Sequence, residues 1–233
     1  MSNPCPLSPI QHTAGPERPR PVNGERLMET LRDLQPTVFV VDDDEAVRAS
    51  LRLLLKSVGL PATVYCSAQE FLAQYEARQP GCVVLDVRMP GMSGLELQQL
   101  LNLRGATVPV IFITGHGDIP MAVEAMQHGA FDFLQKPFRD QDLLDRVQRA
   151  LEKDQRTRLE LKEQDRIRDR LGSLTPRERE VLNLITRGKP NKVVAADLGV
   201  SQRTVEIHRA RVMEKMGASS FAQLVRMVLD SEQ

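Results

Sequence analysis

Polar side chains follow four separate apolar stretches in the first two thirds of the chain. The stretches and the polar residues after them are Thr37–Val41 with Asp42-Asp43-Asp44, Cys82–Leu85 with Asp86, Val108–Ile113 with Thr114, and Phe131–Leu134 with Lys136-Pro137. Three or more carboxylates at one place repel each other unless a hard cation lies among them. Mg²⁺ suits such a set, because it takes carboxylate oxygens, keeps several waters and accepts phosphoryl oxygens.

A lysine and a threonine complete this predicted site. The ammonium of Lys136 offers a mobile positive charge, and the hydroxyl of Thr114 offers one adaptable donor. Such groups stabilise a phosphoryl group in transit by neutralising its charge and positioning it. We therefore predict phosphoryl chemistry, with Asp86 as the nucleophile that becomes an aspartyl phosphate.

Each of these residues taken alone also has a purely structural explanation. An aspartate after a strand is commonly a turn residue or a helix N-cap, and a Lys-Pro pair is commonly part of a loop. These explanations are harder to sustain for four polar positions at the ends of four strands of one sheet.

The elements that must position these residues alternate between strand and helix. A further apolar run covers Ala62–Cys66, and helical patterns cover Glu45–Val58, Ser67–Ala77, Ser93–Leu103, Asp118–His128 and Asp140 onward. Such alternation predicts an α/β domain with a five-stranded parallel sheet, doubly wound in the flavodoxin-like manner, with helices on both faces. Its functional crevice lies at the carboxyl ends of the strands, where the polar residues stand.

The last third of the chain predicts a small all-α domain that contains a helix-turn-helix. Thr175 is a predicted N-cap, Pro176 the first helical residue and Glu178 the partner of a capping box. Gly188 ends this helix, a second covers about Asn191–Leu198, Gly199 makes the turn, and a third runs from about Ser201 to Met216. In a helix-turn-helix the last of these helices lies in the major groove of DNA.

Helical geometry divides the third helix into two faces. Val205, His208, Val212 and Met216 fall on one side and are the predicted core. The DNA side carries Arg203, Glu206, Ile207, Ala210 and, at its edge, Arg211, while Thr204, Lys192 and Arg209 are better placed for phosphates. For His208 a core position is favoured over a DNA contact. Arg209 and Arg211 alone would more often form a solvated face, but ten basic against five acidic side chains in residues 174–226 favour DNA.

The first of these domains resembles the receiver domain of two-component response regulators. The matching residues are Val40-Val41-Asp42-Asp43-Asp44, Leu85-Asp86 to Gly94, Ile113-Thr114-Gly115 and Lys136-Pro137-Phe138. The resemblance implies that Asp86 accepts a phosphoryl group from a sensor histidine kinase. It also implies that Mg²⁺ is held by Asp43 directly, by Asp42 largely through water, by Asp86 and by the backbone carbonyl of Arg88.

The same resemblance implies a conformational switch. Lys136, before an expected cis Pro137, and Thr114 would hold the phosphoryl oxygens, and Phe133 would turn inward as Thr114 moves. That change would repack the Asp118–His128 helix and form a homodimer through this face. Phe133 could also simply be part of the core.

The C-terminal domain resembles the LuxR-type helix-turn-helix of the NarL/FixJ family, and the whole chain resembles its FixJ-like branch. The matching residues include Leu174 to Glu178, Asn191-Lys192, Ser201, Thr204 to Arg209 and Lys215-Met216. The implied function is a response regulator that binds promoter DNA as a dimer, contacts RNA polymerase and most often activates transcription. It is not expected to be an enzyme.

The remaining sequence predicts a leader and a linker. Residues 1–36 hold seven of the fifteen prolines and are a predicted disordered leader, with Met28 as an alternative start of translation. The domains are then expected at 37–151 (receiver), 152–172 (charged helical linker) and 173–233 (helix-turn-helix). A solvated linker helix is favoured over a dimerising coiled coil.

Composition places the protein in the cytoplasm. Its three cysteines have no paired spacing, no apolar run approaches the ~18 residues of a membrane span, and no membrane partner is expected. The distribution of charge favours DNA binding by the C-terminal part of the chain. Residues 37–150 hold 10 basic and 14 acidic side chains, whereas residues 151–233 hold 17 basic and 13 acidic ones.

Two enzyme classes fit less well. A haloacid-dehalogenase-like phosphatase would use Asp42 as nucleophile and Asp44 as acid/base, but it needs an acidic pair at a later strand end, whereas Asp140 and Asp142 open a helix. A serine hydrolase fails because the residues around Ser93 lack the GxSxG spacing.

Overall fold

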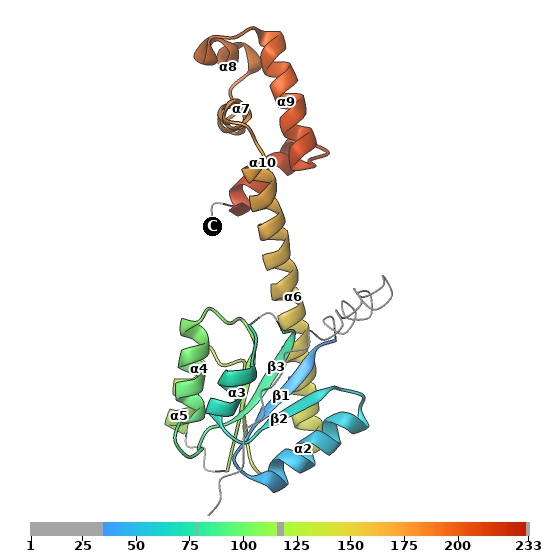
Figure 1. Cartoon of the computed structure of the whole chain (residues 1–233), viewed down its shortest axis with the longest axis vertical. Coiled ribbons are helices and arrows are strands. Elements are labelled where there is room, and N and C mark those ends of the chain that lie inside the picture. Colours follow the sequence, from blue (N-terminus) through green and yellow to red (C-terminus); the bar gives the residue numbers. More distant parts are fainter. Residues whose placement is uncertain (1–34, 78, 116–118, 232–233) are drawn as a thin grey trace, which may run out of the picture.

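The computed structural model describes residues 35–77, 79–115 and 119–231. Most of the predicted leader and Met28 lie outside these ranges. Figure 1 shows an α/β domain at one end, a helical bundle at the other, and a single long helix that joins them. No helix within the described ranges is both long enough and apolar enough to cross a membrane.

The α/β domain contains a five-stranded parallel sheet in the order β2-β1-β3-β4-β5. The strands are β1 (Thr37–Val41), β2 (Ala62–Tyr65), β3 (Gly81–Asp86), β4 (Val110–Thr114) and β5 (Asp132–Gln135). The helices between them are α2 (Glu45–Ser57), α3 (Ala68–Gln74), α4 (Gly94–Leu103) and α5 (Ile119–Gln127). The predicted fold class is confirmed, with bounds that differ by one or two residues at most strand ends.

Alternating side chains of the strands build an apolar core on each face of the sheet. Phe39, Val83, Leu85 and Phe112 pack on one face, with Phe71 of α3 and Leu97 of α4. The neighbouring strand residues point to the other face, where they pack with these residues of α2 and of the long helix α6 (Asp140–Gly172): Leu51, Leu55, Leu143, Val147 and Ala150. Burial on both faces explains why the strands are near-continuous apolar runs.

The long helix α6 belongs to both ends of the molecule. Its first turns pack on the sheet, and Ile167 near its other end is buried in the core of the bundle. The predicted helical linker, residues 152–172, is therefore the C-terminal part of a 33-residue helix that begins in the α/β domain. The helix ends at Gly172, the residue at which the predicted linker also ends.

The bundle consists of α7 (Pro176–Thr186), α8 (Asn191–Leu198), α9 (Gln202–Met216) and α10 (Phe221–Ser231). The predicted capping box is present, because Thr175 accepts a hydrogen bond from the Glu178 amide and Glu178 accepts one from the Thr175 amide. Gly199 ends α8 with a left-handed backbone at φ 65°, which permits the tight turn into α9. Helix, short turn and helix in α8 and α9 match the predicted helix-turn-helix.

Candidate phosphoryl site and DNA-binding surface

The fold brings four predicted site residues to one edge of the sheet. Asp42 directly follows β1, Asp86 and Thr114 are the last residues of β3 and β4, and Lys136 follows β5. Because β1, β3 and β4 are neighbours in a parallel sheet, their carboxyl ends meet at the same edge. The strand-end pattern in the sequence therefore corresponds to a real cluster.

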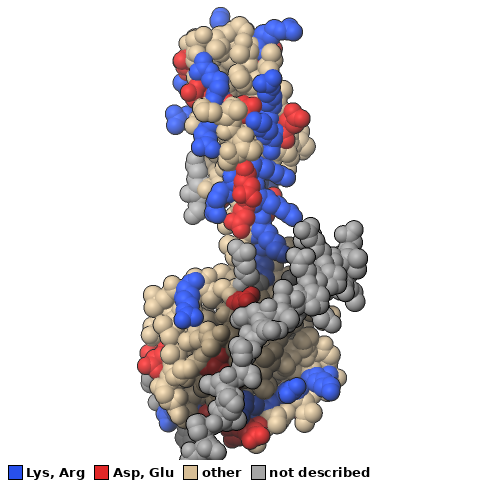
Figure 2. Space-filling model, in the orientation of Figure 1, with Lys and Arg blue, Asp and Glu red and all other residues tan. Residues whose placement is uncertain are grey.

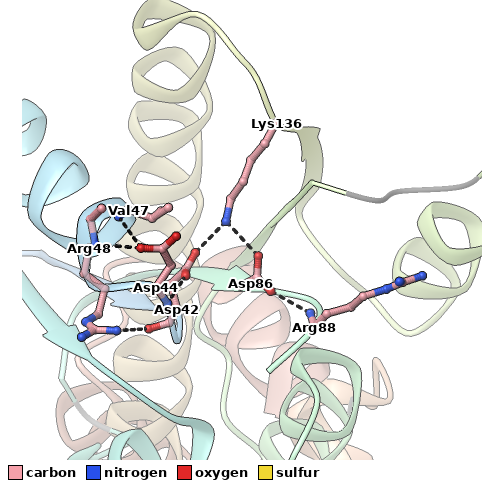
Figure 3. A network of polar contacts seen from close by, with 8 residues as sticks. Asp42, Asp44, Val47, Arg48, Asp86, Arg88 and Lys136 are labelled. Atoms are coloured by element: carbon pink, nitrogen blue, oxygen red, sulfur yellow. Dashed lines mark hydrogen bonds and ion pairs between the residues drawn. The ribbon is translucent and has the colours of Figure 1, made fainter. Parts of the chain in front are cut away.

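The ammonium of Lys136 lies between two carboxylates. Its Nζ is 2.7 Å from Asp42 Oδ2 and 2.9 Å from Asp86 Oδ1 (Figure 3). The Asp42 side chain is 1% exposed, that of Asp86 9%, and that of Lys136 23%. Such a three-charge arrangement is stable in this buried place only because the opposite charges are directly bonded.

Burial and these contacts shift the titration of the site. Burial raises the pKa of Asp86 above its usual value, and hydrogen bonding to Lys136 only partly opposes that effect. For Lys136 burial acts to lower the pKa, but hydrogen bonds to Asp42 and Asp86 outweigh it, so the pKa is raised. Lys136 is therefore held charged, next to a carboxylate whose charge is less favourable than in water.

Backbone amides fix the orientation of the two carboxylates. The Asp86 Oδ2 atom accepts a hydrogen bond of 2.7 Å from the Arg88 amide, and the Asp42 Oδ1 atom accepts one of 2.9 Å from the Asp44 amide. The guanidinium of Arg48 also donates to the Asp42 carbonyl at 2.7 Å. This contact was not predicted, because Arg48 reaches the site from inside a helix whose surface pattern looks ordinary.

The other members of the acidic run lie differently. Asp44 is the N-cap of α2, and its carboxylate accepts hydrogen bonds from the Ala46 and Val47 amides. The side chain of Asp43 is exposed. Within the described ranges no group of three or more His, Cys, Asp or Glu side chains is gathered as a metal site. The structure thus joins Asp42 with Asp86, but it does not place Asp43 in one cluster with them.

Thr114 and Phe133 occupy neighbouring strands. Thr114 is buried at the end of β4, and Phe133 is half-buried on β5, where it packs against the core beneath α4 and α5. Phe133 pairs in register with Phe112, two residues before Thr114. The peptide bond between Lys136 and Pro137 is cis, as expected.

The predicted DNA face of α9 is exposed in the structure. Arg203, Glu206, Ala210 and Arg211 are exposed, and so is Ile207, at 47%. The opposite side carries the fully buried Val205, Val212 and Met216, as the helical pattern predicted, whereas His208 is only half-buried. Figure 2 shows Lys and Arg side chains gathered along α6 and over the bundle.

The residues predicted to contact phosphates are in different situations. Lys192 is exposed at the start of α8. The Thr204 hydroxyl lies 2.8 Å from the Ser201 hydroxyl at the start of α9. Arg209 donates to Asn191 Oδ1 at 3.2 Å, and its guanidinium lies 4.9 Å from the centre of the Phe221 ring. In this structure Arg209 therefore packs within the bundle rather than projecting freely from it.

Comparison with known proteins agrees with the fold of both ends of the chain. Residues 38–148 match the response regulator receiver domain family, and residues 172–228 match the luxR family of bacterial regulatory proteins. The chain belongs to the FixJ-like response regulators, in which a receiver domain is joined to a LuxR-type DNA-binding domain. It is thus a two-component response regulator that controls transcription, and these matches give no support to a phosphatase.

Its relatives share both domains. The chain is 50% identical to the transcriptional regulatory protein FixJ of Azorhizobium caulinodans over 192 aligned residues. The alignment covers 82% of this chain and 91% of that protein. The solved response regulator StyR is 47% identical, with a TM-score of 0.78 over 84% of this chain and 98% of its own. Full-length FixJ from B. japonicum is 40% identical, with a TM-score of 0.52 over 85% and 98%.

Proposed function

We propose that Asp86 accepts a phosphoryl group from the phosphohistidine of a partner sensor histidine kinase. The observation that carries this proposal is the position of Lys136 Nζ, bonded to both Asp42 and Asp86 at the carboxyl edge of the sheet. An ammonium held there neutralises charge at the place where a phosphoryl group on Asp86 would bring more of it.

The proposed transfer is a single displacement at phosphorus. A carboxylate oxygen of Asp86 forms the new P–O bond while the P–N bond to the kinase histidine breaks. The nitrogen keeps the electron pair of that bond and takes up a proton. Lys136 and Thr114 then contact the phosphoryl oxygens, with the lysine as a point charge and the threonine as a hydroxyl donor.

The donor set also fits a magnesium ion. Asp42 and Asp86 both direct a carboxylate oxygen at one ammonium, and this convergence supports the proposal of a cation position between them. Mg²⁺ is commonly held by one or two carboxylates and waters. Asp42, Asp86 and the backbone carbonyl of Arg88 would hold the ion here, and Asp43, whose side chain is exposed in the structure, would have to turn toward it to join them. When bound, it would neutralise phosphoryl charge and hold phosphoryl oxygens in place.

The response to phosphorylation is proposed to pass through Thr114 and Phe133. A phosphoryl group adds roughly −2 charge and three acceptor oxygens, which draw the Thr114 hydroxyl toward Asp86. Phe133 turns into the space that Thr114 leaves, and α5 and β5 repack. This face then forms the homodimer. Exposed apolar side chains of α5, Val123 at 47% and Met126 at 48%, support a contact surface there.

The output is proposed to be DNA binding by the dimer. Arg203, Glu206, Ile207, Ala210 and Arg211 of α9 face the major groove, while Lys192, Thr204 and Arg209 lie near the phosphates. For Arg209 this requires release from Asn191. Two bundles on paired half-sites would recruit RNA polymerase and activate transcription. We propose that the chain acts as a regulator of transcription and not as an enzyme.

Intact-mass measurement tests the acceptor. Wild-type protein is incubated with Mg²⁺ and acetyl phosphate, in parallel with Asp86→Asn and with Asp145→Asn as a matched control on the exposed face of α6. We expect one added phosphoryl group on the wild type and the control, none on Asp86→Asn, and no adduct when Mg²⁺ is chelated.

An adduct that persists on Asp86→Asn would overturn the assignment of the acceptor. The main rival nucleophile is then Asp42, as in a phosphatase that uses Asp44 as its acid/base. The structure argues against that role, because the Asp44 carboxylate is occupied as the cap of α2.

A further inference from the structure

The long helix α6 has supported ends and a solvated middle. Leu151 is its last residue in the apolar core of the receiver, and Ile167 is its first buried residue in the core of the bundle. Among the fifteen residues between them, 152–166, Asp154 alone is buried, although this stretch is dense in charge. A carboxylate with 1% exposure near the start of a charged linker requires a specific reason.

The carboxylate of Asp154 fastens α6 to the start of β3. Its Oδ2 atom accepts a hydrogen bond of 3.0 Å from the Gly81 amide and one of 2.7 Å from Arg158 Nε. The same guanidinium donates to the Gln79 carbonyl at 2.5 Å. Two side chains one turn apart on α6 therefore bind the backbone just before and at the start of β3, more than seventy residues earlier in the chain. Asp154 accepts from the Gly81 amide, and Arg158 donates to the Gln79 carbonyl.

The chemistry of this contact favours orientation over bulk stability. An apolar residue in place of Asp154 would bury surface without the cost of removing a charge from water, so a buried ion pair is weak evidence for stabilisation. Hydrogen bonds to a backbone amide and a backbone carbonyl are directional, however. These hydrogen bonds fix the rotation of α6 about its own axis and its position along that axis relative to β3.

We propose that Asp154 and Arg158, bound to Gln79 and Gly81, form an interdomain latch that keeps α6 a single straight helix between the two domains. With the latch closed, the continuously exposed stretch of α6 covers residues 159–166, about 12 Å of helix. With it open, the Lys153 ammonium still lies 5.7 Å from the centre of the Phe131 ring, and the stretch of α6 without a described contact to the receiver then covers residues 154–166, about 20 Å. A solvated helix of that length is marginal by itself.

The position of the latch connects it to the phosphoryl site. Gly81 is the first residue of β3 and Asp86 is its last, so one buried strand carries the latch at one end and the proposed acceptor at the other. Opening the latch therefore changes the distance and direction of the DNA-binding bundle from the domain that receives the signal.

Hydrogen exchange on the full-length protein tests the latch. Asp154→Ala removes its centre, and Glu163→Ala is the matched control, since Glu163 pairs with Arg166 on the exposed surface of the same helix. Alanine has a higher helix propensity than aspartate or glutamate, so by this effect alone both substitutions should slow hydrogen exchange in residues 155–166. We expect Asp154→Ala instead to speed exchange there by about tenfold or more, because it removes hydrogen bonds of a charged group. Exchange in β1 serves as the measure of receiver folding.

A distance measurement separates a latch from a merely local contact. Spin labels are placed through Leu103→Cys on α4 and Glu214→Cys on α9, in a background with Cys5→Ser and Cys66→Ser. We expect a narrow interdomain distance distribution in the parent and in Glu163→Ala, and a broad one in Asp154→Ala. If Asp154→Ala fails to fold, Arg158→Ala gives the same test, because it removes the Gln79 contact and leaves the Gly81 bond. Unchanged exchange and an unchanged distance distribution in the folded latch variant would overturn the proposal.

Discussion

Replacing Lys136 with methionine tests how strongly one ammonium holds the two carboxylates together. Methionine keeps an unbranched chain but leaves the carboxylates of Asp42 and Asp86 facing each other in a place where their side chains are 1% and 9% exposed. Removing one member of a buried ion pair costs about 3–5 kcal/mol. Because the Lys136 side chain keeps 23% exposure, we expect a loss of unfolding free energy at the lower end of this range, about 3 kcal/mol.

Urea unfolding followed by circular dichroism measures this cost. A double-mutant cycle with Asp42→Asn then separates the pair from other effects, since with one carboxylate already neutral the loss of the lysine costs less. We expect a coupling free energy of at least about 1 kcal/mol between the two positions. Lys162→Met, on the exposed part of α6, is the control and should stay within about 0.5 kcal/mol of the wild type.

Added magnesium extends the same experiment. If the carboxylate oxygens of Asp42 and Asp86 suit a divalent cation, Mg²⁺ should stabilise Lys136→Met more than the wild type, in which the ammonium already neutralises them. A Lys136→Met protein as stable as the wild type, with zero coupling to Asp42 and no response to Mg²⁺, would refute the reasoning about this site.

Three further predictions concern the DNA-binding bundle. Hydrogen bonds to Lys215 and to the Thr175 backbone lower the pKa of Glu178 from 4.5 to about 2. The stability that these bonds contribute is therefore present above pH 4.5 and is lost as the pH falls toward 2. Thermal melts at a series of pH values should show this loss in the wild type and not in Glu178→Gln. Arg203→Ala should weaken specific DNA binding by about 1–3 kcal/mol and relax one base preference, which titrations on a set of sequences would show. Gly199→Ala should cost about 1 kcal/mol because its φ is 65°, whereas Gly172→Ala, without a left-handed backbone, should not.

The features that the sequence predicts well are those governed by local rules. Strand and helix alternate with clear periodicity, and the order of a parallel sheet brings its carboxyl ends together, so Asp42, Asp86 and Lys136 could be placed in one site. The cap at Thr175 and the turn at Gly199 follow from the same short-range chemistry. The core face of α9 follows from helical spacing alone.

The features that it predicts poorly depend on contacts distant in the chain. Asp44 looks like a third acidic site residue, yet its carboxylate caps the helix that follows it. Asp154 looks like one more surface charge, and its burial follows only from its contact with Gly81, 73 residues away. Arg209 has the sequence position of a phosphate contact, but Asn191 and Phe221 hold it within the bundle.

The position of α9 limits how the proposed phosphoryl signal at Asp86 would reach DNA. Figure 1 shows the bundle at the far end of α6 from the sheet. The side chains of α9 that are predicted to read bases are exposed: Arg203, Glu206, Ile207, Ala210 and Arg211. Within the described part of the chain nothing covers these side chains, so the proposed phosphorylation has no covered reading face to release there. The signal must therefore change where the bundle stands, either by pairing two chains or by altering α6. Both routes require the direction of α6 to be well defined, because paired half-sites on DNA have a fixed spacing. A directional hydrogen bond such as the one between Asp154 and Gly81 fixes the direction of α6 better than apolar packing does.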